Sequence, residues 1–96
     1  METKLKHIRL TGDLSVNRLE EIKTQLLTEL LEAQQLRIAV SEVTALHLFT
    51  LQWIYAFVCA ANSEGKQVTI SLDLPAKFDI LVRASKIKKM FNRFQS

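Results

Sequence analysis

The side chains that most often carry catalysis or hold a metal are sparse in this 96-residue chain. It contains two histidines, one cysteine and three aspartates, none of them at the spacing of a metal site. No nucleophile elbow or glycine-rich phosphate loop is present, and two glycines are too few for a phosphate cradle of backbone amides. The sequence therefore predicts no metal, no cofactor and no enzymatic activity.

One pair of side chains, Cys59 and His47, has the chemistry of a nucleophile and its base. The two residues lie on one predicted helix or on the segment that leads into it. Their separation in sequence corresponds to about 18 Å at the rise of an α-helix. A hydrogen bond between them is excluded unless the chain bends back.

Length and composition indicate one small globular domain over residues 1–96, because 48% of the residues are hydrophobic and 24% are charged. No apolar run approaches the roughly 18 residues of a membrane-spanning helix. The first residues lack the apolar region of a signal peptide, and Cys59 has no partner for a disulfide within the chain. We therefore expect a cytoplasmic protein.

Charge is unevenly distributed along the chain, although its net value is only +3. From Arg83 onward no acidic residue occurs, and such a basic tail can bind nucleic acid, anionic lipid or an acidic protein. The tail has no recognisable nucleic-acid-binding motif, so nucleic acid is an unfavoured partner and a solvated helix face is favoured. The basic residues of this tail are Arg83, Lys86, Lys88, Lys89 and Arg93.

Alternation of apolar and polar residues predicts a strand over residues 6–12, with His7 on its solvent side and a turn after Gly12. Ser15 has the character of a helix N-cap. Apolar residues then recur at helical spacing and predict a long amphipathic helix with one buried face. The predicted face comprises Val16, Leu19, Ile22, Leu26, Leu27, Leu30 and Leu31.

The second half of the chain continues this alternation of strands and helices. A central strand is predicted over 36–40, with a break over 41–44, and another strand over 67–72. Between them a helix begins near 48–50 and ends at 62–65, with Gly65 in the left-handed conformation. The order is that of an α/β sheet covered by helices.

Two short helices are predicted at the end of the chain. The first begins at residues 73–75, with Pro75 in its first turn, and buries Phe78, Leu81 and Val82. The next apolar stripe has a different phase, so we infer a break near residues 85–86. The second stripe comprises Ile87, Met90, Phe91 and Phe94.

The helix after residue 48 has one face suited to the sheet and an opposite face that is weakly polar. The opposite face carries Gln52, Ala56 and Ala60, with Trp53 beside them. It has too few charges for an ordinary solvated surface and resembles the core of a protein interface. An alternative is that another element of the same chain covers it. The sheet-facing residues are Leu51, Ile54, Phe57, Val58 and Ala61.

Segments 36–43 (LRIAVSEV) and 46–52 (LHLFTLQ) resemble the STAS domain of anti-sigma-factor antagonists and sulphate-transporter tails. LTGDL at 10–14, GKQV at 65–68 and the ending over 87–91 extend the resemblance over nearly the whole chain. The resemblance implies an α/β fold with a mixed sheet of about four strands and helices packed on it. It also implies a non-catalytic protein-interaction module of a bacterial regulatory or signalling system.

Antagonists of this family accept a phosphate on a hydroxyl just after an aspartate, and the added charge breaks the partner complex. In this chain His47 occupies the aspartate position, Leu48 and Phe49 follow, and Thr50 stands at the glycine position. The usual acceptor hydroxyl is therefore absent, and Thr50 could be phosphorylated only in a shifted register. A threonine at a helix start is more often a cap.

The resemblance predicts a partner surface at the start of this helix, with His47 at its rim. The partner would be a kinase-like anti-sigma factor or a subunit of a transport or sensory complex, and a homodimer is equally consistent. Two alternatives stay open: an accessory STAS subunit of a lipid-transport ABC complex, or a basic-tail binder of nucleic acid or membrane surfaces. The predicted surface comprises His47, Leu48, Phe49, Thr50, Gln52, Trp53 and Ala56.

Overall fold

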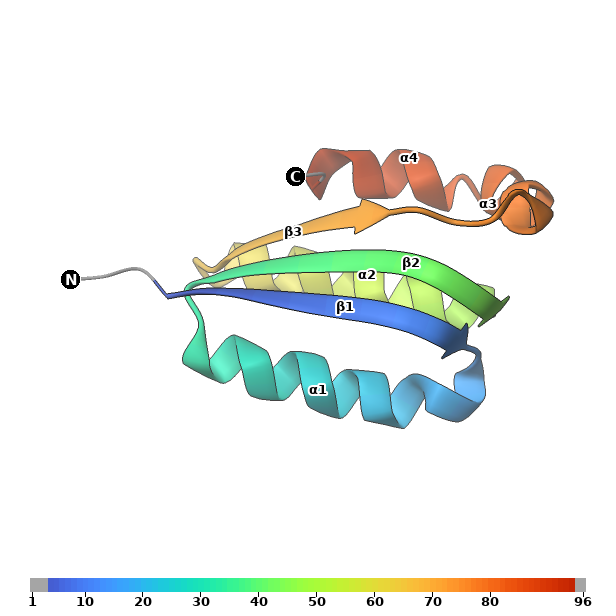
Figure 1. Ribbon diagram of the computed structural model, residues 1–96. Helices are drawn as coiled ribbons and strands as arrows, with labels where there is room; N and C mark the ends of the chain where they lie inside the picture. Colours follow the sequence, from blue (N-terminus) through green and yellow to red (C-terminus); the bar gives the residue numbers. More distant parts are fainter. Residues whose placement is uncertain (1–3, 95–96) are drawn as a thin grey trace.

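Three parallel β-strands form the centre of the structure, a computed structural model that describes residues 4–94 (Figure 1). The central strand β2 (Gln35–Leu46) pairs with β1 (Leu5–Leu14) on one side and with β3 (Gln67–Leu72) on the other. The α/β class and the central position of the second strand are confirmed.

The sheet differs from the expected one in the number and direction of its strands. The described residues form three strands, not four, and all are parallel instead of mixed. The reason is the connectivity: each strand is joined to the next by a helix that carries the chain back to the same end of the sheet. Parallel strands need such crossover connections, and both connections in this sheet contain a helix.

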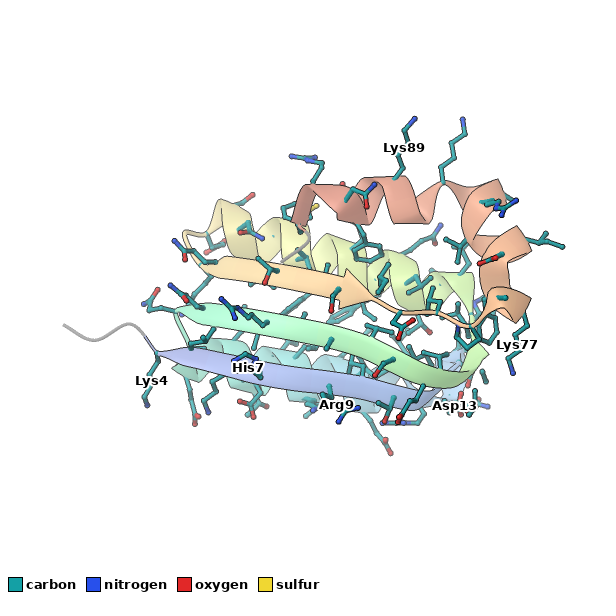
Figure 2. All side chains as sticks on the ribbon, turned by 45° about the horizontal axis from the view of Figure 1, so that its top comes forward. Lys4, His7, Arg9, Asp13, Lys77 and Lys89 are labelled. Atoms are coloured by element: carbon teal, nitrogen blue, oxygen red, sulfur yellow. The ribbon has the colours of Figure 1, made fainter. Side chains whose placement is uncertain are left out.

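Helices α1 (Leu19–Glu32) and α2 (Leu48–Ser63) pack on the same face of this sheet. Successive right-handed crossovers in the strand order β1-β2-β3 place both connections on one side. Figure 2 shows the strands in front of these two helices, and no described helix lies over the near side of the sheet. The strands alternate accordingly, with buried residues toward the helices: Ile8, Leu10, Leu36, Ile38, Val40, Val68 and Ile70.

Strands β1 and β2 are both longer than their alternation predicts, because each contains an irregularity in place of a turn. Gly12 has φ +77° and Glu42 has φ +52°, and the β1–β2 register shifts on either side of Gly12. At both shifts the extra residue lies on β2, which is the mark of β-bulges that absorb it without ending the strand. The turn predicted after Gly12 is therefore wrong, and β1 runs on to Leu14.

The start of α1 also corrects the sequence interpretation. Ser15 precedes a 3₁₀ turn over Val16–Arg18, but its side chain makes no capping hydrogen bond. Instead the Ser15 backbone N–H donates to Oδ1 of Asp13 at 2.8 Å, the pattern of an aspartate-stabilised turn.

The apolar stripe of α1 is wider than its buried face. Leu19, Ile22 and Leu26 are buried, whereas Val16, Leu27 and Leu31 are exposed, and Leu31 is 85% exposed. At 100° per residue Leu27 and Leu31 follow Leu26 and Leu30 around the helix, so they lie beside the sheet contact and not within it.

The chain ends in α3 (Asp79–Ser85) and α4 (Ile87–Phe91), which are preceded and followed by the 3₁₀ turns Ala76–Phe78 and Asn92–Phe94. Lys86 adopts φ +58° between them, which confirms the predicted break. Pro75 lies just before the first helical turn and not within it.

The C-terminal helices are held to the body by a few apolar side chains. Val82 and Phe91 are buried, and Phe94 is half-buried. Met90 is exposed, in contrast to its predicted place in the buried stripe, and the side chain of Ile87 lies outside the described part. The edge of the Tyr55 ring meets Phe91 at 5.5 Å between ring centroids, which anchors α4 on α2.

Asn62, in the last turn of α2, ties this helix to the neighbouring strand. Its Nδ2 donates to the carbonyl oxygens of Val58 at 2.8 Å and Val68 at 3.0 Å, and its Oδ1 accepts the Val68 N–H at 3.4 Å. Gly65 follows with φ +91°, so the predicted left-handed residue after the helix is confirmed.

We expect Asn62→Ala to lower the free energy of unfolding by about 1–3 kcal/mol, because part-buried backbone groups of Val58 and Val68 lose their partner. Equilibrium unfolding in urea measures the change. Ser63→Ala, an exposed position in the same helical turn, is the control and should stay close to wild type. Equal stability of both variants would show that the Asn62 bonds contribute nothing.

Candidate functional site

His47 caps the N-terminus of α2, where the resemblance placed an aspartate. Its imidazole Nδ1 accepts the backbone N–H of Phe49 at 3.0 Å, which satisfies one of the free amides of the first turn. Its own backbone N–H donates to the carbonyl of Leu14 at 3.2 Å. The cap thus also joins the start of α2 to the end of β1.

Thr50 lies in the first turn of the same helix but points into the protein. The residue is fully buried, and its Oγ1 has no hydrogen-bond partner among the described residues. Its backbone N–H donates to the His47 carbonyl at 3.0 Å. Thr50 therefore does not cap the helix through its side chain, and in this arrangement its hydroxyl is shielded from a kinase.

The remaining residues of the predicted surface lie on the outer side of α2, away from the sheet. Phe49 is 59% exposed, Gln52 and Ala56 are exposed, and Leu48 and Trp53 are half-buried. The structure brings these five side chains together along one helix.

The C-terminal helices do not cover this outer face of α2. The side of α2 that receives them carries Tyr55, whose ring lies 5.5 Å from Phe91 and 6.1 Å from Phe94. Gln52, Ala56 and Ala60 are left exposed among the described residues. The sequence left open whether this face is exposed or is covered by another element of the chain. In the structure no described element covers it.

Trp53 is the most firmly held residue of this face. Its ring stacks on Phe57 at 5.6 Å between centroids with 20° between the planes. On the α1 side, Lys23 Nζ lies 5.7 Å from the centroid of the indole, within the range of a cation–π contact. An aromatic side chain fixed in this way loses little entropy when a partner packs on it.

Next to Trp53 an apolar groove of about 320 Å³ runs between α1 and α2. Sequence reasoning missed the α1 wall, because it assigned Leu27 and Leu31 to the core. The six apolar residues of α1 were the available signal, since they span a wider arc than a single sheet contact can bury. The groove is lined by Leu27, Leu30, Leu31, Phe57, Ala60, Ala61, Glu64 and Lys66.

Two carboxylates of α1 are held on the side away from this groove. Lys6 of β1 lies 2.7 Å from Glu32 and 3.2 Å from Glu29, and its hydrogen bonds to Glu32 and then Glu29 raise the pKa of the lysine. The same lysine lowers the pKa of Glu32. These pairs keep both carboxylates at the β1 edge, so that they do not line the groove.

The geometry offers no assembled catalytic or metal centre in the part of the chain that the structure describes. His47 caps the first turn of α2, while Cys59 lies about three turns further along it, half-buried and unpaired. No group of three or more His, Cys, Asp or Glu side chains converges within residues 4–94. None of the described helices has the length and hydropathy of a membrane span.

A sequence profile described as "Mlab, STAS domain" matches residues 2–91. The chain belongs to the STAS domain family. STAS domains are in general non-catalytic interaction modules, and the fold with helices on a β-sheet fits this family. A comparison with curated proteins finds no significant match.

We expect His47→Ala to lower the free energy of unfolding by about 0.5–2 kcal/mol, because the Phe49 N–H loses its acceptor. His47→Asp should recover the loss, since aspartate is a strong N-cap and its charge suits the helix N-terminus. Urea unfolding at neutral pH measures both variants, and exposed His7→Ala is the control. If His47→Asp is no more stable than His47→Ala, the imidazole is not acting as a cap.

Thr50→Val is expected to keep the stability of the domain or to raise it by up to about 1 kcal/mol, because a buried hydroxyl without a partner is costly. Thr50→Glu, which imitates phosphorylation, should unfold the domain because it buries an unpaired charge. Urea unfolding and circular dichroism report both results. A folded Thr50→Glu variant would contradict the buried placement of Thr50.

Proposed function

We propose that this STAS domain is a constitutive protein-interaction module of a bacterial regulatory or signalling system. Its partner would contact the outer face of α2, defined by Leu48, Phe49, Gln52, Trp53 and Ala56, with His47 at the rim. The observation that carries the proposal is that this face is uncharged and that Phe49, Gln52 and Ala56 on it are exposed. Such a composition is typical of interface cores and not of solvated helix surfaces.

The geometry around Phe49 and Trp53 supports binding of a protein. Phe49 projects into solvent at the start of α2, and Trp53 is pre-positioned by Phe57 and Lys23 one turn further on. Two large aromatic side chains, one of them rigid, are characteristic of binding hot spots. The groove beside Ala60 extends the apolar area toward α1.

The residues in the first turn of α2 favour a partner contact that phosphorylation of this turn does not regulate. Leu48 and Phe49 lack hydroxyl groups, and the hydroxyl of Thr50 is buried. This supports a stable association more than the phosphorylation-controlled release of an anti-sigma-factor antagonist. We therefore keep two partner classes, a kinase-like regulatory protein and, as the alternative, the ATPase of a lipid-transport complex. The unpaired Cys59 supports a cytoplasmic setting.

We expect Phe49→Ala and Trp53→Ala each to raise the Kd for the partner by tenfold or more, as truncation of an aromatic hot spot does. The ligands are purified kinase-like regulators and transport ATPase subunits encoded in the same genome, measured by biolayer interferometry. Leu5→Ala, at an exposed apolar residue of β1 outside the surface, is the matched control. Circular dichroism confirms that each variant is folded.

A variant with both aromatic side chains truncated tests whether the partner binds the outer face of α2. If folded Phe49→Ala/Trp53→Ala binds a validated partner with wild-type affinity, the outer face of α2 is not the contact. Size-exclusion chromatography with light scattering tests the homodimer: a wild-type dimer that the double variant converts to monomer would assign the face to self-association.

A further inference from the structure

A second surface, formed by α3 and α4, combines exposed aliphatic side chains with positive charge. On α3 and its leading turn, Ile80 is 84% exposed and stands three residues after Lys77 and three before Arg83. At that spacing the three side chains follow one stripe of the helix. A large aliphatic side chain with two cations beside it is left facing solvent.

α4 and the residues beside it repeat this arrangement. Lys86, Lys89, Met90 and Arg93 recur at intervals of three and four residues, and all four are exposed. Figure 2 shows Lys89 projecting from α4 away from the rest of the molecule. Met90 is 38% exposed although the rest of its helix is anchored by buried Phe91. The side chain of Lys88 lies outside the described part.

Among the described residues, no ion pair neutralises the cations of this surface. Asp79 is the single acidic residue in the sequence from Ala76 to Phe94. Ion pairs among the described residues involve only Lys6, Arg18 and Lys23 as cations. Lys77 instead donates to the Thr44 carbonyl at 3.2 Å, and Arg93 lies 5.3 Å from the ring centroid of Phe94. The charges of Arg83, Lys86 and Lys89 are left for an external anion.

We propose that this α3–α4 surface binds an anionic lipid bilayer. The ammonium and guanidinium groups contact lipid phosphates, while Ile80 and Met90 enter the boundary between headgroups and acyl chains. This combination is the one that peripheral membrane helices use, with apolar side chains for insertion and Lys or Arg for attraction to acidic lipids. The proposal does not depend on the function of the α2 face, which is a separate surface.

The exposed aliphatic residues favour a bilayer over nucleic acid. Single-stranded nucleic acid binds through aromatic platforms that stack on bases. Here Phe78 and Phe94 are half-buried, and Lys77 and Arg93 lie over their rings. The side chain of Ile80 cannot bind a phosphate group, whereas its burial in the apolar part of a bilayer is favourable.

The test measures co-sedimentation of the purified chain with phosphatidylcholine vesicles prepared with and without phosphatidylglycerol. We expect binding only to the vesicles that contain phosphatidylglycerol, with affinity that falls as salt is raised. Lys86→Glu/Lys89→Glu should weaken binding by at least tenfold. Arg9→Glu/Arg37→Glu makes the same charge change on exposed residues of β1 and β2 and should weaken it far less.

A matched pair of variants tests how much the aliphatic side chain of Ile80 contributes to vesicle binding. Ile80→Ser should weaken vesicle binding several-fold, because the inserted side chain is lost. Leu31→Ser is the control, since Leu31 is equally exposed, at 85% against 84%, but lies on the acidic helix α1. Urea unfolding verifies that both variants are folded.

Three results would overturn the proposal. The first is no binding of the wild type to phosphatidylglycerol vesicles. The second is equal loss of binding in the α3–α4 variants and in their controls. The third is binding to polyuridylic acid at the same salt that exceeds vesicle binding and is unaffected by Ile80→Ser, which would assign the surface to nucleic acid.

Discussion

Parallel pairing of strands that follow one another in sequence is the constraint on which the rest of this structure depends. Each connection must return the chain to the starting end of the sheet, and the preferred handedness puts both returning helices on one face. α1 and α2 therefore lie side by side, which creates the groove between them and brings Lys23 to Trp53. The same constraint gathers the start of α2 and the end of β1 at one edge, where His47 and Leu14 are hydrogen-bonded.

The first turn of α2 combines a capped helix start with residues that expose no hydroxyl group. An aspartate at position 47 would cap the helix with its carboxylate, and the imidazole of His47 provides the same acceptor without a permanent negative charge. The two residues that follow are apolar, and Thr50 is turned into the core. The helix start is thus capped, and its exposed side chain is that of Phe49, which has no hydroxyl group.

Most of the fold could be predicted from the sequence, because its hydrophobic periods are clear. The limits of β3, the start of α2 and the break at Lys86 followed from alternation, helical spacing and a change of phase. The bulges of β2 and the positive φ of Gly12 opposite them could not be predicted, since a glycine after alternating residues indicates a turn equally well. The strand count was wrong because it was inferred from a family resemblance and not from residues of this chain.

The site was predicted less completely than the fold, for a physical reason. Periodicity assigns a residue to a face of its own helix, but it does not say how much of that face a neighbour will cover. Gln52, Ala56 and Ala60 were predicted to lie opposite the sheet contact, and all three are exposed. Leu27 and Leu31 were assigned to the core, although the apolar residues of this segment span a wider arc than one sheet contact can bury.

The position of α4 explains why no described element covers the outer face of α2. α4 and its 3₁₀ turn pack on the rest of the domain through Phe91 and Phe94. Both rings contact Tyr55 on the β3 side of α2. Ala56 and Ala60 lie further around α2 from Tyr55, and both stay exposed with α4 packed there. Once Tyr55 has fixed α4, the weakly polar face around Trp53 has no described element left to cover it. Its composition then reflects either tolerance of an apolar patch or the presence of a partner, and a tryptophan held between Lys23 and Phe57 favours the partner.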